Sequence, residues 1–192
     1  VPGVAAASGE DNGFALIIDK DGKPIGNPNN GPPTLGGDIT EGPLSAWDLT
    51  DGSSYPHGDQ ALIDNGSFKK GHFAIGDTVT IASQAGTRQF ELVGSVTFGG
   101  ADSPAGATFA LFDTATAQAF MGKPGELDGI RAKADSGVSQ TELTQSIRQV
   151  VGSDVEVLTG SALTKENQND IEQGLKFFNI MLTVFAAIAL FV

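Results

Sequence analysis

The stretch Ala107-Thr-Phe-Ala-Leu-Phe-Asp-Thr-Ala-Thr-Ala-Gln-Ala-Phe-Met-Gly122 passes from a strand pattern directly into a helix pattern. Residues 107–112 are short and almost wholly apolar, which predicts a strand. Asp113 or Thr114 can cap the helix that follows, and Gly122 stands where glycine commonly ends a helix. A strand joined to a helix in this way is the unit from which we infer the fold class.

A second unit of the same kind and then a further strand follow along the chain. Residues 129–134 predict a strand, and Ser139 with Glu142 forms a capping box that begins a second helix. Residues 155–158 then predict another strand. The resulting order β-α-β-α-β predicts an α+β domain whose sheet is covered by helices on at least one face.

The chain before this region predicts a small β-rich unit over residues 38–98. Candidate strands are residues 61–64, 78–82 and 88–98, which are separated by turn sequences. The apolar residues of the last strand alternate with polar ones. This alternation breaks at residues 93–94, which predicts a β-bulge there.

Residues 14–19 predict the first strand of the chain, and residues 19–22 predict a turn after it. The turn sequence Asp-Lys-Asp-Gly is similar to the start of a calcium-binding loop, but Pro24 and Asn30 stand where that loop requires Gly and Glu. A plain turn is therefore the preferred interpretation. Residues 26–37 are rich in Asn, Pro and Gly and predict an irregular loop.

The C-terminal residues 180–192 contain no charge, no proline and no glycine. A membrane-spanning helix needs about 20 apolar residues, so this run alone is too short to cross a bilayer. A buried core helix is the ordinary alternative for a run of this length, but the run lacks the polar face that a surface helix shows. We therefore expect a transmembrane helix that begins here and continues past Val192.

An amphipathic segment leads into this run from residue 161. Ile171, Leu175, Phe178 and Leu182 fall on one helical face, and Gly174 within the segment is the expected point of bending. One continuous helix with a polar half and an apolar half would pass a rigid-body movement between a water-exposed domain and a membrane. These five residues are therefore the candidate coupling residues.

Composition limits the functions open to this protein. The formal net charge of −12 and the small number of Lys and Arg residues, 11, argue against a nucleic-acid partner. The sequence has no cysteine, and it lacks the standard motifs of zinc sites, phosphate-binding loops and nucleophile elbows. His57 and His72 lie in polar surroundings and are interpreted as surface residues. We therefore expect neither catalysis nor a bound cofactor or metal.

Several segments, in their order along the chain, carry a resemblance to a known family. They are Gln60-Ala-Leu-Ile-Asp64, Gly76-Asp-Thr-Val-Thr-Ile81, Phe90-Glu-Leu-Val-Gly-Ser-Val96, Ala107-Thr-Phe-Ala-Leu-Phe-Asp-Thr-Ala-Thr-Ala-Gln118, Gly137-Val-Ser-Gln-Thr-Glu-Leu143 and Leu182-Thr-Val-Phe-Ala-Ala-Ile-Ala-Leu-Phe-Val192. Together they resemble the extracytoplasmic core domain of MacB/FtsX-like ABC transporter permeases. The resemblance covers nearly the whole chain, and the order of the segments is its specific part.

The resemblance implies a two-lobed extracytoplasmic domain. A porter-like β-α-β-α-β lobe would take residues 1–35 and 101–160, and an inserted β-rich lobe would take residues 36–100. Residues 161–192 would form a stalk helix and the start of a transmembrane helix. The domain would therefore lie on the outer side of a bacterial cell membrane.

The resemblance also implies a function without catalysis in this chain. Family members act as dimers with separate ATPase subunits or domains, and they transmit ATP-driven movement to their extracytoplasmic parts. The expected role is to couple this movement to export of a peptide or lipid substrate, or to an extracytoplasmic partner protein. The alternatives are a membrane-anchored ligand-binding or adhesion domain and a hydrolase with an unrecognised site.

Overall fold

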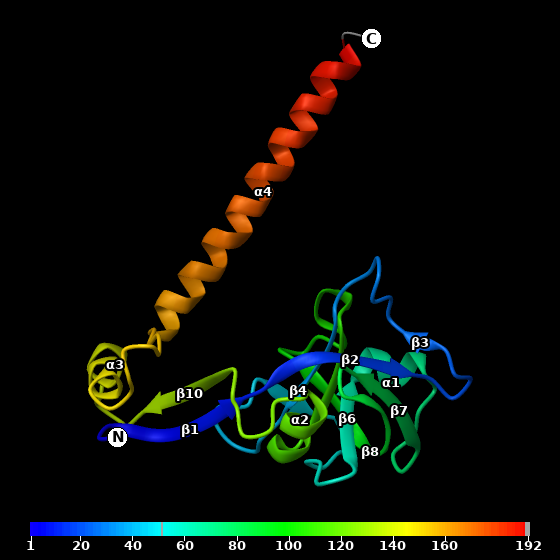
Figure 1. Cartoon of the computed structure of the whole chain (residues 1–192), viewed down its shortest axis with the longest axis horizontal. Helices are drawn as coiled ribbons and strands as arrows, with labels where there is room; N and C mark the ends of the chain where they lie inside the picture. The colour runs from blue at the N-terminus through cyan, green and yellow to red at the C-terminus, as the bar shows by residue number, and fades with distance from the viewer. Residues whose placement is uncertain (51, 191–192) are drawn as a thin grey trace. The chain divides into compact units, whose positions relative to one another are not determined.

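The structure, a computed structural model, describes residues 1–50 and 52–190, without the side chains of residues 167, 170, 171, 174 and 185–190. The described chain forms two compact units. One unit consists of residues 6–133, and the other consists of residues 1–5 together with residues 134–192. Figure 1 shows the elements of both units.

The first unit contains most of the described strands. Its elements are, in chain order, β1 (Val4–Glu10, which begins in the other unit), β2 (Asn12–Ile18), β3 (Pro24–Ile25), β4 (Thr34–Asp38), β5 (Trp47–Leu49), β6 (Gln60–Asp64), α1 (Asn65–Lys70), β7 (Thr78–Ser83), β8 (Gly86–Phe98), the 3-10 turn η1 (Pro104–Gly106), β9 (Thr108–Phe112), α2 (Thr114–Phe120) and β10 (Gly129–Ala134).

Six strands of this unit close into a ring of hydrogen-bonded neighbours. The order around the ring is β2-β4-β9-β6-β8-β7, and β7 pairs again with β2. The β4–β9 and β6–β8 pairs are parallel, whereas the other pairs of the ring are antiparallel. The short strands β3 and β5 pair with β2 and β8. Closure creates an interior that side chains must fill.

Aromatic rings lie at the centre of this interior. Phe90 of β8, Phe112 of β9 and Phe120 of α2 are buried, and their ring centroids lie 4.7, 5.2 and 5.5 Å apart. Two of the three pairs are T-shaped, an arrangement that aromatic rings favour. The helix α2 therefore contributes its last residue, Phe120, to the core of the ring.

Most of the predicted strands and turns are confirmed. The strand predictions at residues 14–19, 61–64, 78–82, 88–98, 107–112 and 129–134 correspond to β2, β6, β7, β8, β9 and β10. Asp113 is the cap of α2, since its carboxylate accepts a hydrogen bond from the backbone N–H of Thr116 at 2.9 Å. Gly122 follows the helix with a φ of 76°, as expected of a terminating glycine. The strand β1 was not predicted.

The predicted bulge in β8 is also confirmed. Pairing between β6 and β8 passes from Ala61 with Leu92 to Leu62 with Gly94, so Val93 has no partner in the ladder. The extra residue restores the side-chain alternation on the two faces of the sheet. Leu62 and Val93 accordingly join a second apolar cluster outside the ring, to which Trp47 of β5 also packs.

The prediction of an irregular loop through residue 37 is wrong at its end, where β4 forms. This strand lies between β2 and β9 in the ring. A Cβ atom on Gly36 would lie 2.6 Å from Cε of Met121, and one on Gly37 would lie 2.9 Å from the backbone oxygen of Asp11. The two glycines therefore permit close packing in a central strand, although their composition is typical of a loop.

A buried carboxylate fastens three parts of this unit together. Asp64, at the end of β6, has no exposed surface. Its Oδ2 accepts hydrogen bonds from the backbone N–H of Ser67 at 3.0 Å and from the hydroxyl of Ser103. Its Oδ1 accepts one from the backbone N–H of Phe109 at 2.8 Å. One side chain thus satisfies donors at the start of α1, before η1 and in β9.

The second unit consists mainly of two helices, α3 (Gln140–Arg148) and α4 (Gly160–Leu190). The predicted capping box is confirmed, because Ser139 accepts from the backbone N–H of Glu142 and the Glu142 carboxylate accepts from the backbone N–H of Ser139. Leu143 lies buried on the inner side of α3. Within the part of the chain that the structure describes, none of the helices combines the length and the apolarity that a membrane crossing requires.

The predicted strand at residues 155–158 is wrong, since these residues form irregular chain. The strand that precedes them, β10, pairs with β1 in a separate two-stranded sheet and not with the ring. The guanidinium of Arg148 donates to the backbone oxygen of Val157 at 2.6 Å, so this carbonyl bonds to a side chain rather than to a strand. Strand preference depends on pairing with a neighbouring strand, and in the described chain these residues pair with none.

The fold is therefore of the predicted α+β class. The division into a lobe of residues 1–35 and 101–160 and an inserted lobe of residues 36–100 stays a prediction. In the structure, strands from both stretches share the closed ring.

Replacing Asp64 by alanine should lower the free energy of unfolding by about 3 kcal/mol, because three hydrogen-bond donors lose a buried charged acceptor. Urea unfolding of the variant and of the wild type measures the change. The matched control is Asp21→Ala at an exposed turn position, which should cost less than about 0.5 kcal/mol. Equal losses in the two variants would contradict the fastening role of Asp64.

Candidate functional site

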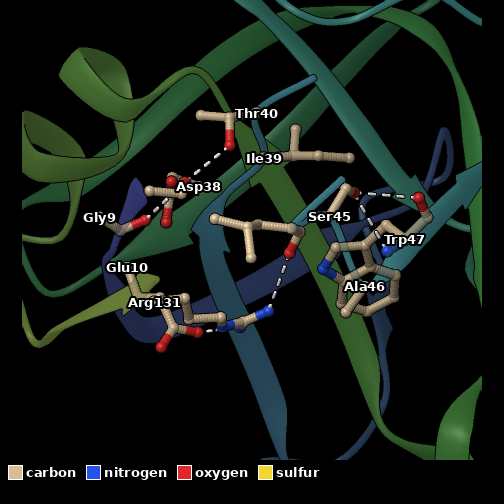
Figure 2. A pocket seen from close by; sticks show the side chains of 11 residues that line it. Gly9, Glu10, Asp38, Ile39, Thr40, Ser45, Ala46, Trp47 and Arg131 are labelled. Carbon is tan, nitrogen blue, oxygen red and sulfur yellow. Dashed lines mark hydrogen bonds and ion pairs between the residues drawn. The ribbon is translucent and has the colours of Figure 1, made fainter. Parts of the chain in front are cut away.

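A small hollow lies between β1, β10 and the segment from β4 to β5 (Figure 2). It encloses about 30 Å³, and its walls are residues 8–10, 38–40, 44–47 and Arg131. Two carboxylates, those of Glu10 and Asp38, one guanidinium and the indole of Trp47 are its distinctive groups. The hollow is partly open to solvent and brings polar and aromatic groups together on one surface.

The polar groups around the hollow bond mainly to one another. Figure 2 shows the Arg131 guanidinium beside the Glu10 carboxylate, with which it forms an ion pair. The guanidinium also donates to the backbone oxygen of Leu44 at 3.4 Å. The hydroxyls of Ser8 and Thr40 are hydrogen-bonded at 2.9 Å. These pairings already satisfy part of the polar lining of the hollow.

A cluster of charged residues lies next to the hollow, and we call Asp11, Asp38, Lys123 and Asp128 the acidic junction. Asp11 stands between β1 and β2, and Asp38 ends β4. Lys123 and Asp128 belong to the connection from α2 to β10. Residues that are distant in the sequence therefore meet where the β1–β10 ribbon joins the closed ring.

Lys123 holds two sides of the junction together. Its Nζ lies 2.6 and 2.7 Å from the two carboxylate oxygens of Asp128, and it donates to the backbone oxygen of Asn12 at 2.8 Å. The backbone N–H of Asn12 donates in turn to Oδ2 of Asp128 at 2.7 Å. Asp38 fixes the neighbouring backbone, because its Oδ1 accepts from the N–H of Asp11 at 2.8 Å.

Asp11 differs from the other members of the junction. Its side chain has no exposed surface, and in the described residues neither carboxylate oxygen has a hydrogen-bond partner. The nearest cation, Nζ of Lys123, lies 3.9 Å from Oδ1. Burial raises the pKa of Asp11, and the negative charges of Asp128 and Asp38 raise it further, whereas Lys123 acts in the opposite direction.

The pKa values of Asp128 and Lys123 are shifted so that both groups favour their charged forms. The hydrogen bond from Lys123 lowers the pKa of Asp128, and the backbone N–H of Asn12 adds to this effect. The same contact with Asp128 raises the pKa of Lys123. The junction therefore contains a stable ion pair and, beside it, a buried carboxyl group that resists ionisation.

The chemistry of these groups does not point to a metal centre. Within the described part of the chain, no three His, Cys, Asp or Glu side chains are arranged so that they could hold a metal ion. In the junction the ammonium group of Lys123 already occupies the position between the oxygens of Asn12 and Asp128. In the hollow, Glu10 is paired with Arg131.

The predicted coupling residues lie on α4, apart from the hollow and the junction in sequence. Leu175 and Phe178 are each 57 % exposed, and Leu182 is 51 % exposed. Ile171 and Gly174 lie outside the residues whose side chains the structure describes. The helix therefore presents a row of uncovered apolar side chains, and their role in coupling stays a prediction.

Sequence reasoning missed the acidic junction. Its members come from three separate segments, and no motif spacing links them. The available signal was local, since Asp11 and Asn12 interrupt two runs of small and apolar residues. That signal is ordinary for a turn, and the burial of Asp11 involves residues distant in the sequence, among them Asp38 and Lys123.

Trp47 and Arg131 should contribute very differently to stability. Trp47 packs edge-on against Phe98 and Phe109, with centroids 5.3 and 4.9 Å apart, so Trp47→Ala should lower the free energy of unfolding by about 2 kcal/mol. Arg131→Ala removes a partly exposed ion pair and should cost less than about 1 kcal/mol. Urea unfolding of both variants tests this order, and a larger loss for Arg131→Ala would overturn it.

Comparison with known proteins identifies one family. A family model described as the MacB-like periplasmic core domain matches residues 1–150. The matched range contains the closed ring, the hollow, the acidic junction and α3, and it ends before α4. No curated protein matches the chain significantly.

Proposed function

This chain belongs to the MacB-like periplasmic core domain family, a domain typical of ABC transporter permeases, and on this premise we propose a mechanical role for it. The domain couples ATP-driven movement of transmembrane helices to export, or to the action of a partner protein outside the membrane. In this role it binds and transmits, while ATP is hydrolysed by another subunit or domain.

The observation that carries this proposal is α4, which follows the matched domain directly. It is a helix of 31 residues, which corresponds to about 46 Å. Its second half bears exposed apolar side chains, among them Phe177, Ile180 and Val184, which are 67, 63 and 52 % exposed. A long helix whose far half is apolar supports a stalk that enters a membrane and moves as a rigid rod.

The proposal defines the partners and the location of the domain. It lies on the extracytoplasmic side of a bacterial cell membrane, and it works with an ABC ATPase subunit and a second permease subunit. An extracytoplasmic protein, or a peptide or lipid substrate, is the further partner. The net charge of −12 supports the absence of nucleic acid from this set.

The finer parts of the proposal concern the lobes and the coupling face. Residues 1–35 with residues 101–160 act as the porter-like lobe, and residues 36–100 act as the inserted lobe. Leu175, Phe178 and Leu182 form the coupling face together with Ile171 and Gly174. Their support is the helical spacing of the apolar residues and, for the first three, their exposure.

A membrane-anchored ligand-binding or adhesion domain is the second candidate. The hollow beside Trp47 favours it, because aromatic and charged groups converge there on one surface. The two candidates differ in their dependence on ATP: only the permease domain should change its conformation when the associated ATPase hydrolyses ATP.

Replacing Gly174 by proline in the full-length transporter should abolish transport while ATP hydrolysis continues, because proline within a helix costs about 3 kcal/mol and breaks it. The control is Gly174→Ala, which favours the helix by about 1 kcal/mol and should leave transport intact. Both activities are measured in reconstituted membranes. Normal transport by the proline variant would refute the coupling role of α4.

A further inference from the structure

We propose that the acidic junction binds a single proton, held between the carboxyl groups of Asp11 and Asp128, and that this proton fastens the β1–β10 ribbon to the closed ring. This proton site does not depend on the transport role proposed above. It rests on the burial of Asp11, on the hydrogen bonds around it and on the place of the junction in the chain.

The first argument is the state of the Asp11 side chain. It is completely buried, and neither of its oxygens accepts a hydrogen bond in the described residues. A buried ionised carboxylate without a donor is costly, whereas a protonated carboxyl group can itself donate. Lys123 Nζ lies 3.9 Å from Oδ1 of Asp11 and 2.6 Å from Oδ1 of Asp128, so the Asp128 carboxylate is the neighbouring acceptor that we infer for this proton.

The second argument is that Lys123 cannot take the place of the proton. An ammonium group has three N–H donors. Those of Lys123 have nearer acceptors in the two oxygens of Asp128, at 2.6 and 2.7 Å, and in the backbone oxygen of Asn12, at 2.8 Å. Its distance of 3.9 Å to Asp11 is too long for a hydrogen bond.

The third argument is the charge that faces Asp11 from each neighbouring element. Asp128 and Lys123 face it from the connection between α2 and β10, and Asp38 faces it from the end of β4. Glu126 acts on Lys123 from the same connection, and Glu10 on β1 is paired with Arg131. Ionised Asp11 would therefore add a third carboxylate to a cluster with a single ammonium group, and repulsion would weaken the contacts.

The effect of losing this proton depends on where the chain connects the two compact units. The chain passes between the two compact units after residue 5 and after residue 133, and these passages lie in β1 and β10. The junction fastens the ring ends of both strands, because Asp128 donates its N–H to the oxygen of Glu10 at 2.8 Å and Asp11 donates to Asp38. Loss of the proton should loosen both chain connections together.

The contribution of Asp11 to the stability of the folded protein should decrease as the pH rises. Because the pKa of Asp11 is higher in the folded protein than in the unfolded chain, its contribution to stability is complete below the unfolded pKa. It is lost as the pH rises through the folded pKa. Within that interval the folding equilibrium constant falls by up to about tenfold per pH unit, relative to a variant with a neutral residue at position 11.

The direct test is a carbon-13 NMR titration of the side-chain carboxyl of Asp11 in the whole wild-type chain. We expect its midpoint above the ordinary aspartate value of about 3.9. Amide hydrogen exchange in β1 and β10 should become faster over the same pH range. A midpoint at or below the ordinary value would overturn the proposal.

A pair of variants provides the second test. Asp11→Asn keeps a neutral donor at the junction and should remove the fall in the folding equilibrium constant with rising pH. The control is Asp77→Asn: its carboxylate has a pKa lowered by the hydrogen bond from Lys20, so its contribution is lost as the pH falls. Retention of the wild-type pH dependence by Asp11→Asn would also refute the proton site.

Discussion

Phe90, Phe112 and Phe120 pack against one another inside a ring of six strands, and the positions of the other elements in this unit depend on that packing. The ring closes only if β4 fits between β2 and β9, and Gly36 and Gly37 allow this because they leave room for Met121 and for the backbone of Asp11. Closure gives these strands neighbours on both sides, so their backbone groups are satisfied without help from solvent.

Two buried aspartates show the different uses of a carboxylate in such a structure. Asp64 accepts hydrogen bonds from three parts of the chain, so its charge is compensated and it acts as a fastener. Asp11 is equally buried but receives no hydrogen bond in the described residues. The first arrangement uses a carboxylate as a shared hydrogen-bond acceptor, and the second favours a group that holds a proton.

These features bear on the mechanical role that we propose for this member of the MacB-like periplasmic core domain family. Such a role would need a stiff body and defined connections through which force can pass. The closed ring supplies stiffness, since bending it would strain hydrogen bonds all around the circle. The β1–β10 ribbon carries both passages of the chain between the two compact units, and α4 extends the second unit as one helix.

The sequence by itself determined the local elements and the family. The strand–helix pattern of residues 107–122, the capping box at Ser139 and the bulge in β8 depend on neighbouring residues, and each was predicted correctly. The ordered segments from residue 60 to residue 143 likewise carried the resemblance that the family match confirms.

Tertiary structure decided the features that depend on distant partners. It made a central strand from glycine-rich residues 34–38, left residues 155–158 without a partner strand, and buried Asp11 beside Asp128. The physical reason is that strand pairing and burial depend on residues far apart in the chain, whereas caps and turns are complete within a few residues.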